Sequence, residues 1–376
     1  MSLLFLASLA LVVWTFAGYP ALVIALARKK SAAPGAVPVS VTVGVTVVIA
    51  TRNEATRIRQ RVDNVLASHY PDDLLHVLVV DDGSSDGTAE RVAQVNDDRV
   101  RLLRLPTPLG KAAALSRAMV FVDTPLTIFA DARQSFETFA VRRLVDAFDQ
   151  PSIGLAAGRL ELAPDETTGL YWRLETALRR AESRLGWAHA ATGAIYAIRT
   201  ALFTPMPAGL ILDDVWTPVH IARQGHRLVF VDDAVAREPA AMSDSAEFRR
   251  KLRTLSGNWQ LLARAPWLLV PQRNRVFFAW FSHKFLRLIA PWGLVLALVS
   301  SLLGVVHGAA AWLQLAFWLQ LTAYGTAVLA LLAPALARRV PLATAAGAFL
   351  LLNFAAMVSL PAAWLGQRHP GGFWRR

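Results

Sequence analysis

The chain has 376 residues, enough for two or three domain-sized units, and 55% of them are hydrophobic while only 18% are charged. This composition is too apolar for an average soluble protein and is typical of a chain with several membrane spans. The formal net charge is +12, but no basic helix interleaved with aromatic residues forms a recognition module, so no nucleic-acid partner is expected. Cysteine is absent, which excludes a disulfide framework and a thiolate metal site.

The first predicted element is a membrane span. Leu3–Ala27 carries no charge and is long enough, at about 1.5 Å per residue, to cross a bilayer core. A signal peptide fits less well, because the basic cluster Arg28–Lys30 follows the apolar run instead of preceding it. The positive-inside rule places this cluster in the cytoplasm. We therefore expect an N-terminal transmembrane helix over residues 1–30, followed by a Pro- and Gly-containing linker over residues 31–42.

Residues 43–265 alternate short β-branched runs with helical periods, a pattern typical of βαβ units. The predicted strands are Val43–Ala50, Leu75–Val80, Val100–Leu105 and Leu126–Ala130. The predicted helices are Ala55–Ala67, Thr88–Gln94 and Lys111–Val122. The pattern predicts an α/β domain with a mostly parallel Rossmann-type sheet. A dinucleotide site is disfavoured because no G-x-G-x-x-G follows the first strand, and a P-loop is also absent.

Distinctive polar residues follow three of these strands. The run 51–54 (Thr-Arg-Asn-Glu) comes after the first strand, Asp81 and Asp82 after the second, and Asp131 after the fourth. Ligands of such sheets bind beyond the carboxyl ends of the strands. The sequence therefore predicts that a metal and a nucleotide bind in one crevice at this edge.

The C-terminal part returns to the membrane. Arg273–Arg287 mixes cations with aromatic residues, which favours an amphipathic helix in the headgroup plane over residues 266–287, although the segment is also interpretable as the flank of the next span. Three uncharged stretches follow, at Leu288–Val306, Ala309–Ala337 and Pro341–Gly366. We expect a membrane domain of about three helices over residues 288–376. Four spans would put the Arg-containing tail outside, against the positive-inside rule, so its side is left open.

Several motifs of the soluble half resemble the family 2 glycosyltransferases in order and approximate spacing. They are ATRNE (50–54), VVDDGSSDGT (79–88), GKAAALSRA (110–118), DAR (131–133), TGAIYAIR (192–199) and LDD (212–214). With the flanking spans, the layout is similar to membrane synthases of hyaluronan, cellulose and poly-N-acetylglucosamine. The resemblance implies a GT-A-like catalytic domain on the cytoplasmic side of a bacterial-type inner membrane. It also implies inverting transfer from a nucleoside-diphosphate sugar, with a UDP-sugar expected, to a polysaccharide or lipid-linked acceptor, and export or assembly partners.

The resemblance assigns a donor-binding set. Asp82 would accept hydrogen bonds from the nucleotide base, and Lys111, at a helix start, would reach the phosphates. The alternatives are an Asx-turn at Asp81–Ser84 and a solvated surface lysine. The predicted nucleotide-sugar-binding residues are Thr51, Arg52, Glu54, Asp81, Asp82, Lys111, Arg250 and Arg253.

Asp131 matches the first aspartate of the family's D-x-D metal motif, which implies Mg²⁺ or Mn²⁺ as the cofactor. The second acidic position is Arg133 in this chain, which puts the metal geometry in doubt. An arginine there would instead suit a bidentate phosphate contact.

The acceptor side and the catalytic acids come from the last motifs. Asp213 and Asp214 match the family's acidic pair, and we expect Asp214 to act as the general base that removes the acceptor hydroxyl proton. The alternative is that one of the pair is a helix N-cap and the other favours the helix dipole. The predicted acceptor-side residues are Thr192, Gly193, Arg199 and Trp259.

The family's Q-x-x-R-W motif is only partly present. Arg253 matches its arginine, whereas Arg250 and Thr254 replace its glutamine and tryptophan, which weakens the case for a processive polymerase. The basic run around Arg250 would also suit a helix that touches anionic lipid. Two other functions stay open: a polyprenyl-phosphate sugar transferase, and a catalytically inactive, nucleotide-binding membrane partner.

Overall fold

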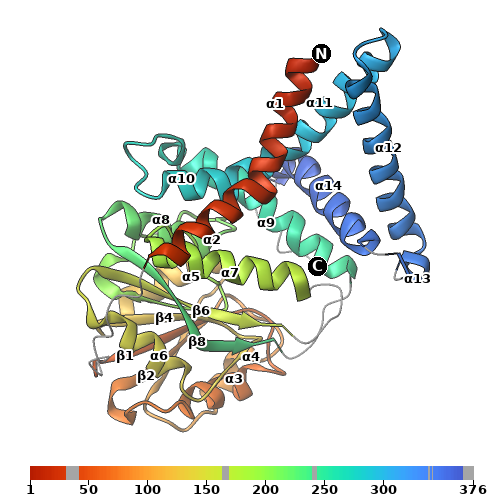
Figure 1. The fold of residues 1–376 in the computed structure, drawn as a ribbon. Helices are drawn as coiled ribbons and strands as arrows, with labels where there is room; N and C mark the ends of the chain where they lie inside the picture. The colour runs from red at the N-terminus through yellow and green to blue at the C-terminus, as the bar shows by residue number, and fades with distance from the viewer. Residues whose placement is uncertain (31–41, 163–168, 239–243, 338, 341, 367–376) are drawn as a thin grey trace.

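The computed structural model describes residues 1–30, 42–162, 169–238, 244–337, 339–340 and 342–366. Figure 1 shows a curled sheet with its helices on one side of the molecule and a group of long helices on the other, with α7 between them. Almost all of the predicted linker and the C-terminal tail lie outside the described residues.

The soluble part is built on one eight-stranded sheet in the order β3-β2-β1-β4-β7-β6-β8-β5. Its strands are β1 (Val45–Thr51), β2 (Leu75–Asp81), β3 (Val100–Arg104), β4 (Leu126–Asp131), β5 (Ser135–Phe136), β6 (Ile153–Glu161), β7 (Ile195–Arg199) and β8 (Arg227–Arg237). The first four strands are parallel, whereas β7 runs antiparallel to both β4 and β6. The α/β, GT-A-like fold is therefore confirmed, in a mixed sheet in which only β5 and β7 run against the other six strands.

Helices cover both faces of this sheet. They are α3 (Ile58–Leu66), α4 (Thr88–Ala93), α5 (Lys111–Ala118), α6 (Ala140–Asp146) and α8 (Asp213–Arg223). Successive side chains of β1 enter opposite cores, as strand geometry requires. Val47 and Ile49 pack in the core that contains Val62 of α3, and Val48 packs in the core that contains Leu115 of α5. The strand ends are thus held between two packed layers.

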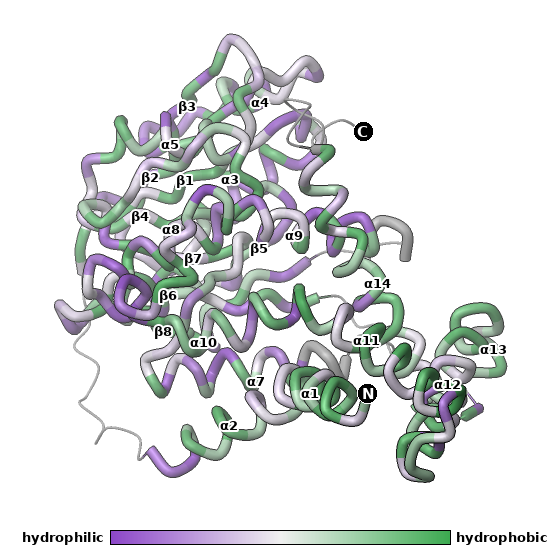
Figure 2. The backbone as a smooth tube through the Cα atoms, turned by 90° about the horizontal axis from the view of Figure 1, so that it is seen from above, coloured by the Kyte–Doolittle hydropathy of each residue, from purple (hydrophilic) through white to green (hydrophobic). Residues whose placement is uncertain are grey.

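Within the described residues, four helices are long and apolar enough to cross a membrane: Ser2–Lys29, Phe277–Val306, Ala311–Leu332 and Ala343–Leu365. The first consists of α1 (Ser2–Val13) and α2 (Tyr19–Lys29), joined by the π-helical turn Trp14–Gly18. The others are formed by α10 (Phe277–Trp280), a π-helical turn at Phe281–Phe285 and α11 (Leu286–Val306), by α12 (Ala311–Leu332), and by α14 (Ala343–Gly366), which follows the short α13 (Pro334–Ala337). Figure 2 shows these helices as largely hydrophobic, which suggests association with a membrane.

The predicted interfacial segment is not a separate helix. Pro266–Leu269 forms a 3₁₀ turn, and the helix that begins at Phe277 continues through Phe285 into α11. One helix carries both the aromatic–basic stretch and the apolar stretch. The structure therefore agrees with the alternative interpretation, in which the aromatic–basic stretch is the flank of the next span. Its placement in a headgroup layer stays a prediction.

Two helices connect the sheet to the apolar helices. Helix α7 (Gly169–Leu185) packs against α2, and α9 (Asp244–Arg264) packs against α14. Gln260 of α9 accepts a hydrogen bond from the Ile211 amide at 3.0 Å and donates to the Gly209 carbonyl at 2.8 Å. Helix α9 therefore fixes the loop that leads into α8.

Candidate active site

Three neighbouring strand ends form one edge of the sheet. In the parallel register, Thr51 of β1 lies opposite Asp81 of β2, and Ala50 lies opposite Asp131 of β4. The Asp82 amide donates to the Thr51 carbonyl at 2.9 Å, which extends the pairing of β1 and β2 beyond the last strand residue. The polar residues that the sequence places after these strands therefore lie side by side.

Asp82 holds the loop before α5. Its two carboxylate oxygens accept hydrogen bonds from the amides of Leu109 at 2.7 Å and Gly110 at 2.9 Å. Asp81 instead accepts a hydrogen bond from the Ser84 hydroxyl, so the Asx-turn interpretation holds for Asp81. The turn needs glycine at Gly83, because its φ is +66° and a Cβ would lie 2.8 Å from a backbone nitrogen. Recognition of the base by Asp82 stays a prediction.

Open space adjoins this turn. A cavity of about 300 Å³ is lined by Gly83, Ser84, Arg104, Leu105 and Pro106. It lies where β2 and β3 end, beside Asp82. Arg104, which sequence analysis did not single out because it lies in an ordinary strand, contributes a cation to this space.

Lys111 links β4 to α8. It is the first residue of α5, and its Nζ lies 2.8 Å from Oδ1 of Asp131 and 3.0 Å from Oδ2 of Asp213. Burial lowers the pKa of Lys111, but the two carboxylates raise it more, and the net result is a pKa well above the usual value. Lys111 is therefore a charged bridge between two acids and not a solvated surface lysine.

The acidic pair lies in the first turn of α8. The N-cap residue is Leu212, without a side-chain cap, so the alternative that one aspartate is the N-cap is wrong. Burial raises the pKa of Asp214 to about 6; the neighbouring Asp213 adds to the rise, and Lys111 opposes it. A half-buried carboxylate with such a pKa is ionised at neutral pH and still basic enough to accept a proton.

Thr192 and Gly193 lie beside Asp214. A Cβ on Gly193 would lie 3.4 Å from Oδ2 of Asp214, so the carboxylate adjoins this backbone. The Thr192 hydroxyl accepts a hydrogen bond from Nη1 of Arg179 at 2.8 Å. Arg179 belongs to α7 and was not predicted, because a cation on one face of an amphipathic helix has no distinguishing pattern. The structure thus brings together Thr192, Gly193 and Asp214.

Glu54 and Arg133 form an ion pair across the strand ends. Nε of Arg133 lies 3.1 Å from Oε1 of Glu54, and Arg57 contacts the other oxygen at 3.0 Å. Arg133 therefore compensates a carboxylate of the predicted donor-binding set, while Arg52 is exposed to solvent.

The residues at this edge fit a divalent cation. Asp131 is half-buried, and its carboxylate already forms an ion pair with one cation, the Lys111 ammonium. Mg²⁺ and Mn²⁺ are commonly held by one or two carboxylates together with substrate phosphates, so one aspartate is an adequate protein donor set.

Arg199 does not belong to this site. In the antiparallel pairing of β7 with β4, Arg199 lies opposite Leu126, at the end of β4 that is remote from Asp131. Its guanidinium donates to the carbonyls of Ile153, Phe148 and Gln150 at 2.9–3.2 Å. The prediction that Arg199 faces the acceptor is therefore wrong.

The predicted residues of α9 have different surroundings. The Trp259 indole donates to the Ser359 hydroxyl of α14 at 3.0 Å, so this ring joins α9 to an apolar helix. Its contact with an acceptor stays a prediction. Arg250 and Arg253 are half-buried on the same helix. Their contact with the donor stays a prediction.

Comparisons with known proteins agree with this site. Residues 46–203 match the family model "Glycosyl transferase family 2". The chain is 23% identical over 295 residues to the probable glycosyltransferase YdaM of Bacillus subtilis (strain 168), which covers 73% of this chain and 70% of that protein. The fold of this chain is similar to that of the mannosyltransferase PcManGT from Pyrobaculum calidifontis, solved in complex with GDP-Man and Mn²⁺. That likeness has a TM-score of 0.71 at 25% identity and covers 95% of this chain and 99% of the other.

The matched range begins in β1 and ends just after β7, and it contains Asp82, Lys111, Asp131 and Gly193. Beyond it, Asp213 is tied to the matched part by the Lys111 bridge. The chain therefore carries a glycosyltransferase family 2 domain and is a glycosyltransferase that uses nucleotide sugars.

Proposed function

We propose that the protein is an inverting glycosyltransferase that moves a sugar to a polysaccharide or lipid-linked acceptor at a membrane. The observation that carries this proposal is the Asp214 carboxylate, which lies against Gly193 and has a raised pKa. A sugar hydroxyl is a poor nucleophile at neutral pH, so its proton must leave as the new bond forms. Asp214 would take that proton, and the hydroxyl oxygen would attack the anomeric carbon.

The other end of the site suits the departing nucleoside diphosphate. The donor base would occupy the cavity beside Gly83, and its pyrophosphate would lie near the start of α5, where helix amides and Lys111 supply positive charge. Asp131 would hold a divalent cation, which when bound neutralises charge on the pyrophosphate. We expect Arg253 to add to this stabilisation from α9.

A lipid-linked phosphate acceptor is a second candidate. It is favoured by Arg179, whose cation reaches Thr192 from α7, the helix that packs against α2. A phosphate oxygen needs no general base, so loss of the Asp214 carboxylate would then affect transfer little. The two candidates therefore differ in one measurable property.

Nucleoside diphosphate release from a panel of nucleotide sugars tests the function itself. The panel contains UDP-sugars and, because PcManGT is solved with GDP-Man, GDP-mannose. We expect detergent-solubilised protein to turn over at least one donor with Mn²⁺ or Mg²⁺ present, and chelation to abolish this turnover. Binding of nucleotide without turnover of any donor would contradict the proposal. Product sizing then separates single addition from polymerisation.

The orientation in the membrane gives a further prediction. Arg28, Lys29 and Lys30 follow the first apolar helix, so the sheet domain should lie on the cytoplasmic side, where nucleotide sugars are made. A reporter fused after Arg133 should read as cytoplasmic. A reporter that reads as external would contradict the arrangement.

A further inference from the structure

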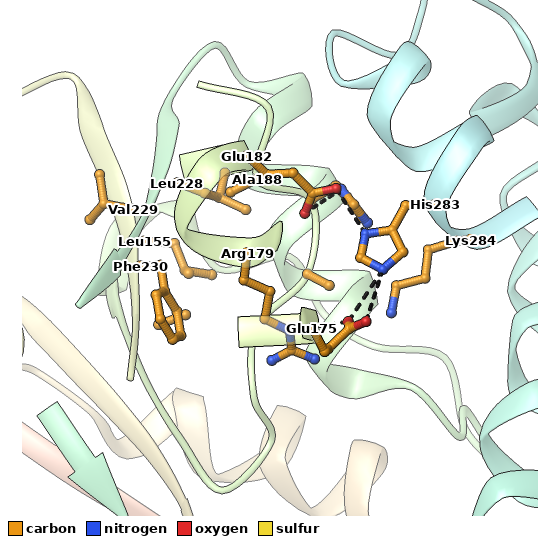
Figure 3. Close-up of a pocket in the computed structure, with 13 residues that line it drawn as sticks. Leu155, Glu175, Arg179, Glu182, Ala188, Leu228, Val229, Phe230, His283 and Lys284 are labelled. Carbon is orange, nitrogen blue, oxygen red and sulfur yellow. Dashed lines mark hydrogen bonds and ion pairs between the residues drawn. The ribbon is translucent and has the colours of Figure 1, made fainter. Parts of the chain in front are cut away.

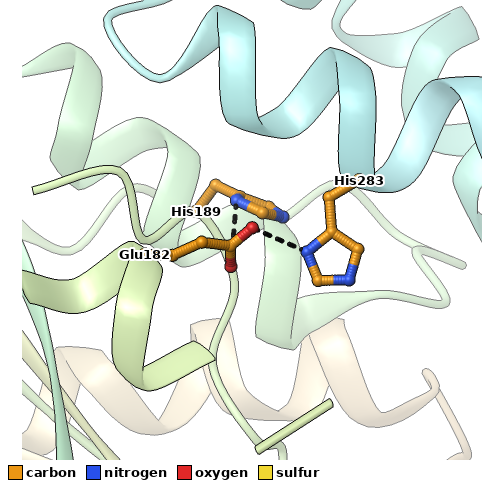
Figure 4. A group of neighbouring side chains, drawn as sticks. All are labelled: Glu182, His189 and His283. Carbon is orange, nitrogen blue, oxygen red and sulfur yellow. Dashed lines mark hydrogen bonds and ion pairs between the residues drawn. The ribbon is translucent and has the colours of Figure 1, made fainter. Parts of the chain in front are cut away.

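A buried polar cluster lies between the sheet domain and the apolar helices, outside the proposed active site. Glu182 of α7, His189 of the following loop and His283 of the π-helical turn Phe281–Phe285 each offer a ligand atom, and these atoms lie within 4.8 Å of one another. Figure 4 shows the three side chains converging from separate segments. Each is only 2% exposed. A π-helical turn within a helix is frequently found at a functional site.

One ring nitrogen of His189 has no hydrogen-bond partner among the described residues. Its Nδ1 lies 3.3 Å from the Trp187 carbonyl, which accepts the ring N–H in the tautomer protonated at that nitrogen. The other nitrogen, Nε2, is then a lone-pair acceptor, and it is buried with no hydrogen-bond partner in the described part of the chain. Figure 4 shows dashed lines from the Glu182 carboxylate to both the His189 ring and the His283 ring.

The surrounding contacts orient the other two side chains. Nδ1 of His283 lies 2.8 Å from Oε1 of Glu182, and its Nε2 lies 3.2 Å from Oε1 of Glu175. Glu175 in turn contacts Arg287 at 3.2 Å, and the Tyr19 hydroxyl donates to Glu182 at 2.7 Å. A histidine whose far nitrogen is fixed by a carboxylate is the usual environment of a metal-binding imidazole.

The space at this cluster suits one small occupant. A cavity of about 10 Å³ is lined in part by Glu175, Arg179, Glu182, His189, His283 and Lys284. Figure 3 shows five of these side chains around it: Glu175, Arg179, Glu182, His283 and Lys284. That volume is about one water or one ion. A proton shared between His283 and its two carboxylates would satisfy those groups but would leave Nε2 of His189 unpaired, whereas a cation would engage all three side chains.

We propose that Glu182, His189 and His283 bind a divalent transition metal of the Zn²⁺ type, which ties α7 to the apolar helix that begins at Phe277. Two imidazoles and one carboxylate form a donor set that Zn²⁺ and Co²⁺ accept. The metal is structural in this position, because the cluster is enclosed by protein. It is separate from the donor cation at Asp131.

Co²⁺ titration of metal-stripped protein tests this site. The measurement uses the Asp131→Asn chain without nucleotide, so that the donor cation does not contribute. We expect one equivalent of Co²⁺ with the visible absorption of a low-coordinate nitrogen–oxygen site, displaced by Zn²⁺. Adding His189→Gln should abolish that band, and His189→Cys, which keeps a metal donor, should restore binding. Glu175→Gln should weaken Co²⁺ affinity about 10- to 100-fold, because it releases the far nitrogen of His283.

The matched control is His220→Gln. Its ring is hydrogen-bonded to the Trp216 carbonyl on α8, away from the cluster, so Co²⁺ binding should be unchanged. If the folded Asp131→Asn protein binds no Co²⁺, the proposal is overturned, and the occupant of the cavity is a proton or a water. An absorption band that survives in folded His189→Gln protein would also overturn it. Neither result depends on sugar transfer, so the proposed function is tested separately.

Discussion

Replacing Asp214 with asparagine is expected to slow sugar transfer about 10²- to 10⁴-fold, the usual contribution of a positioned general base. Asparagine keeps the shape of the side chain but cannot take a proton. Nucleotide affinity should stay near that of the wild type, because Asp214 lies against Gly193 and not at the ends of β1 and β2. Transfer and nucleotide binding are measured on the same preparation.

The pH dependence of the wild type gives the same assignment a second test. A base must be deprotonated to act, so transfer should fall as the pH decreases through about 6, the raised pKa of Asp214. The folded pKa is above the unfolded value, so ionising Asp214 costs folding free energy above that pH. Asp214→Asn should therefore leave the melting temperature at pH 7.5 equal or higher, while it removes the activity.

Asp233→Asn is the matched control, because Asp233 is an exposed aspartate of β8. It should change neither transfer nor its pH profile. If Asp214→Asn transfers sugar at a near-normal rate, Asp214 is not the base, and the lipid-phosphate acceptor becomes the better proposal.

Replacing Lys111 with methionine is expected to be the most destabilising single change at the site. Lys111 is the ion-pair partner of Asp131 and Asp213, and its loss leaves two carboxylates facing each other in a partly closed crevice. Removing one partner from a buried ion pair typically costs about 3–5 kcal/mol of unfolding free energy, which is an upper range here because Asp131 is half-exposed. Denaturant unfolding measures this loss.

The same variant should also shift the pH profile. Lys111 lowers the pKa of Asp214, so without it that pKa rises further and transfer is lost at a higher pH than in the wild type. Lys111→Arg keeps the charge and should recover most of the stability. Arg117→Met, an exposed position on the same helix, is the control and should have little effect. Wild-type stability in Lys111→Met would contradict the bridge.

The sequence predicts the strand ends well because the strands are parallel and buried. Val45–Thr51 and Leu126–Asp131 are apolar runs, each interrupted by one threonine, that end in polar residues. Parallel neighbours share one direction, so the ends of these strands coincide. Arg199 shows where this inference fails. An apolar run does not reveal strand direction, and the antiparallel β7 puts the end of its strand at the opposite edge.

Side-chain partners that are distant in the chain were beyond prediction. A helix-start lysine suggested a phosphate contact, but its carboxylate partners come from β4 and α8 and meet it only in the folded sheet. Glu182 and His283 are 101 positions apart, and neither lies in a motif. Such a cluster depends on how α7 packs against the apolar helices, which periodicity does not specify.

The anomeric configuration of the product tests the proposed mechanism most directly. If a hydroxyl activated by Asp214 attacks the anomeric carbon as the nucleoside diphosphate leaves from the opposite side, the new bond has the configuration opposite to that of the donor. Proton NMR of the product formed from a donor of known configuration measures this. We predict inversion in the wild type, with the same product formed far more slowly by Asp214→Asn. Retention of the donor configuration would contradict the account.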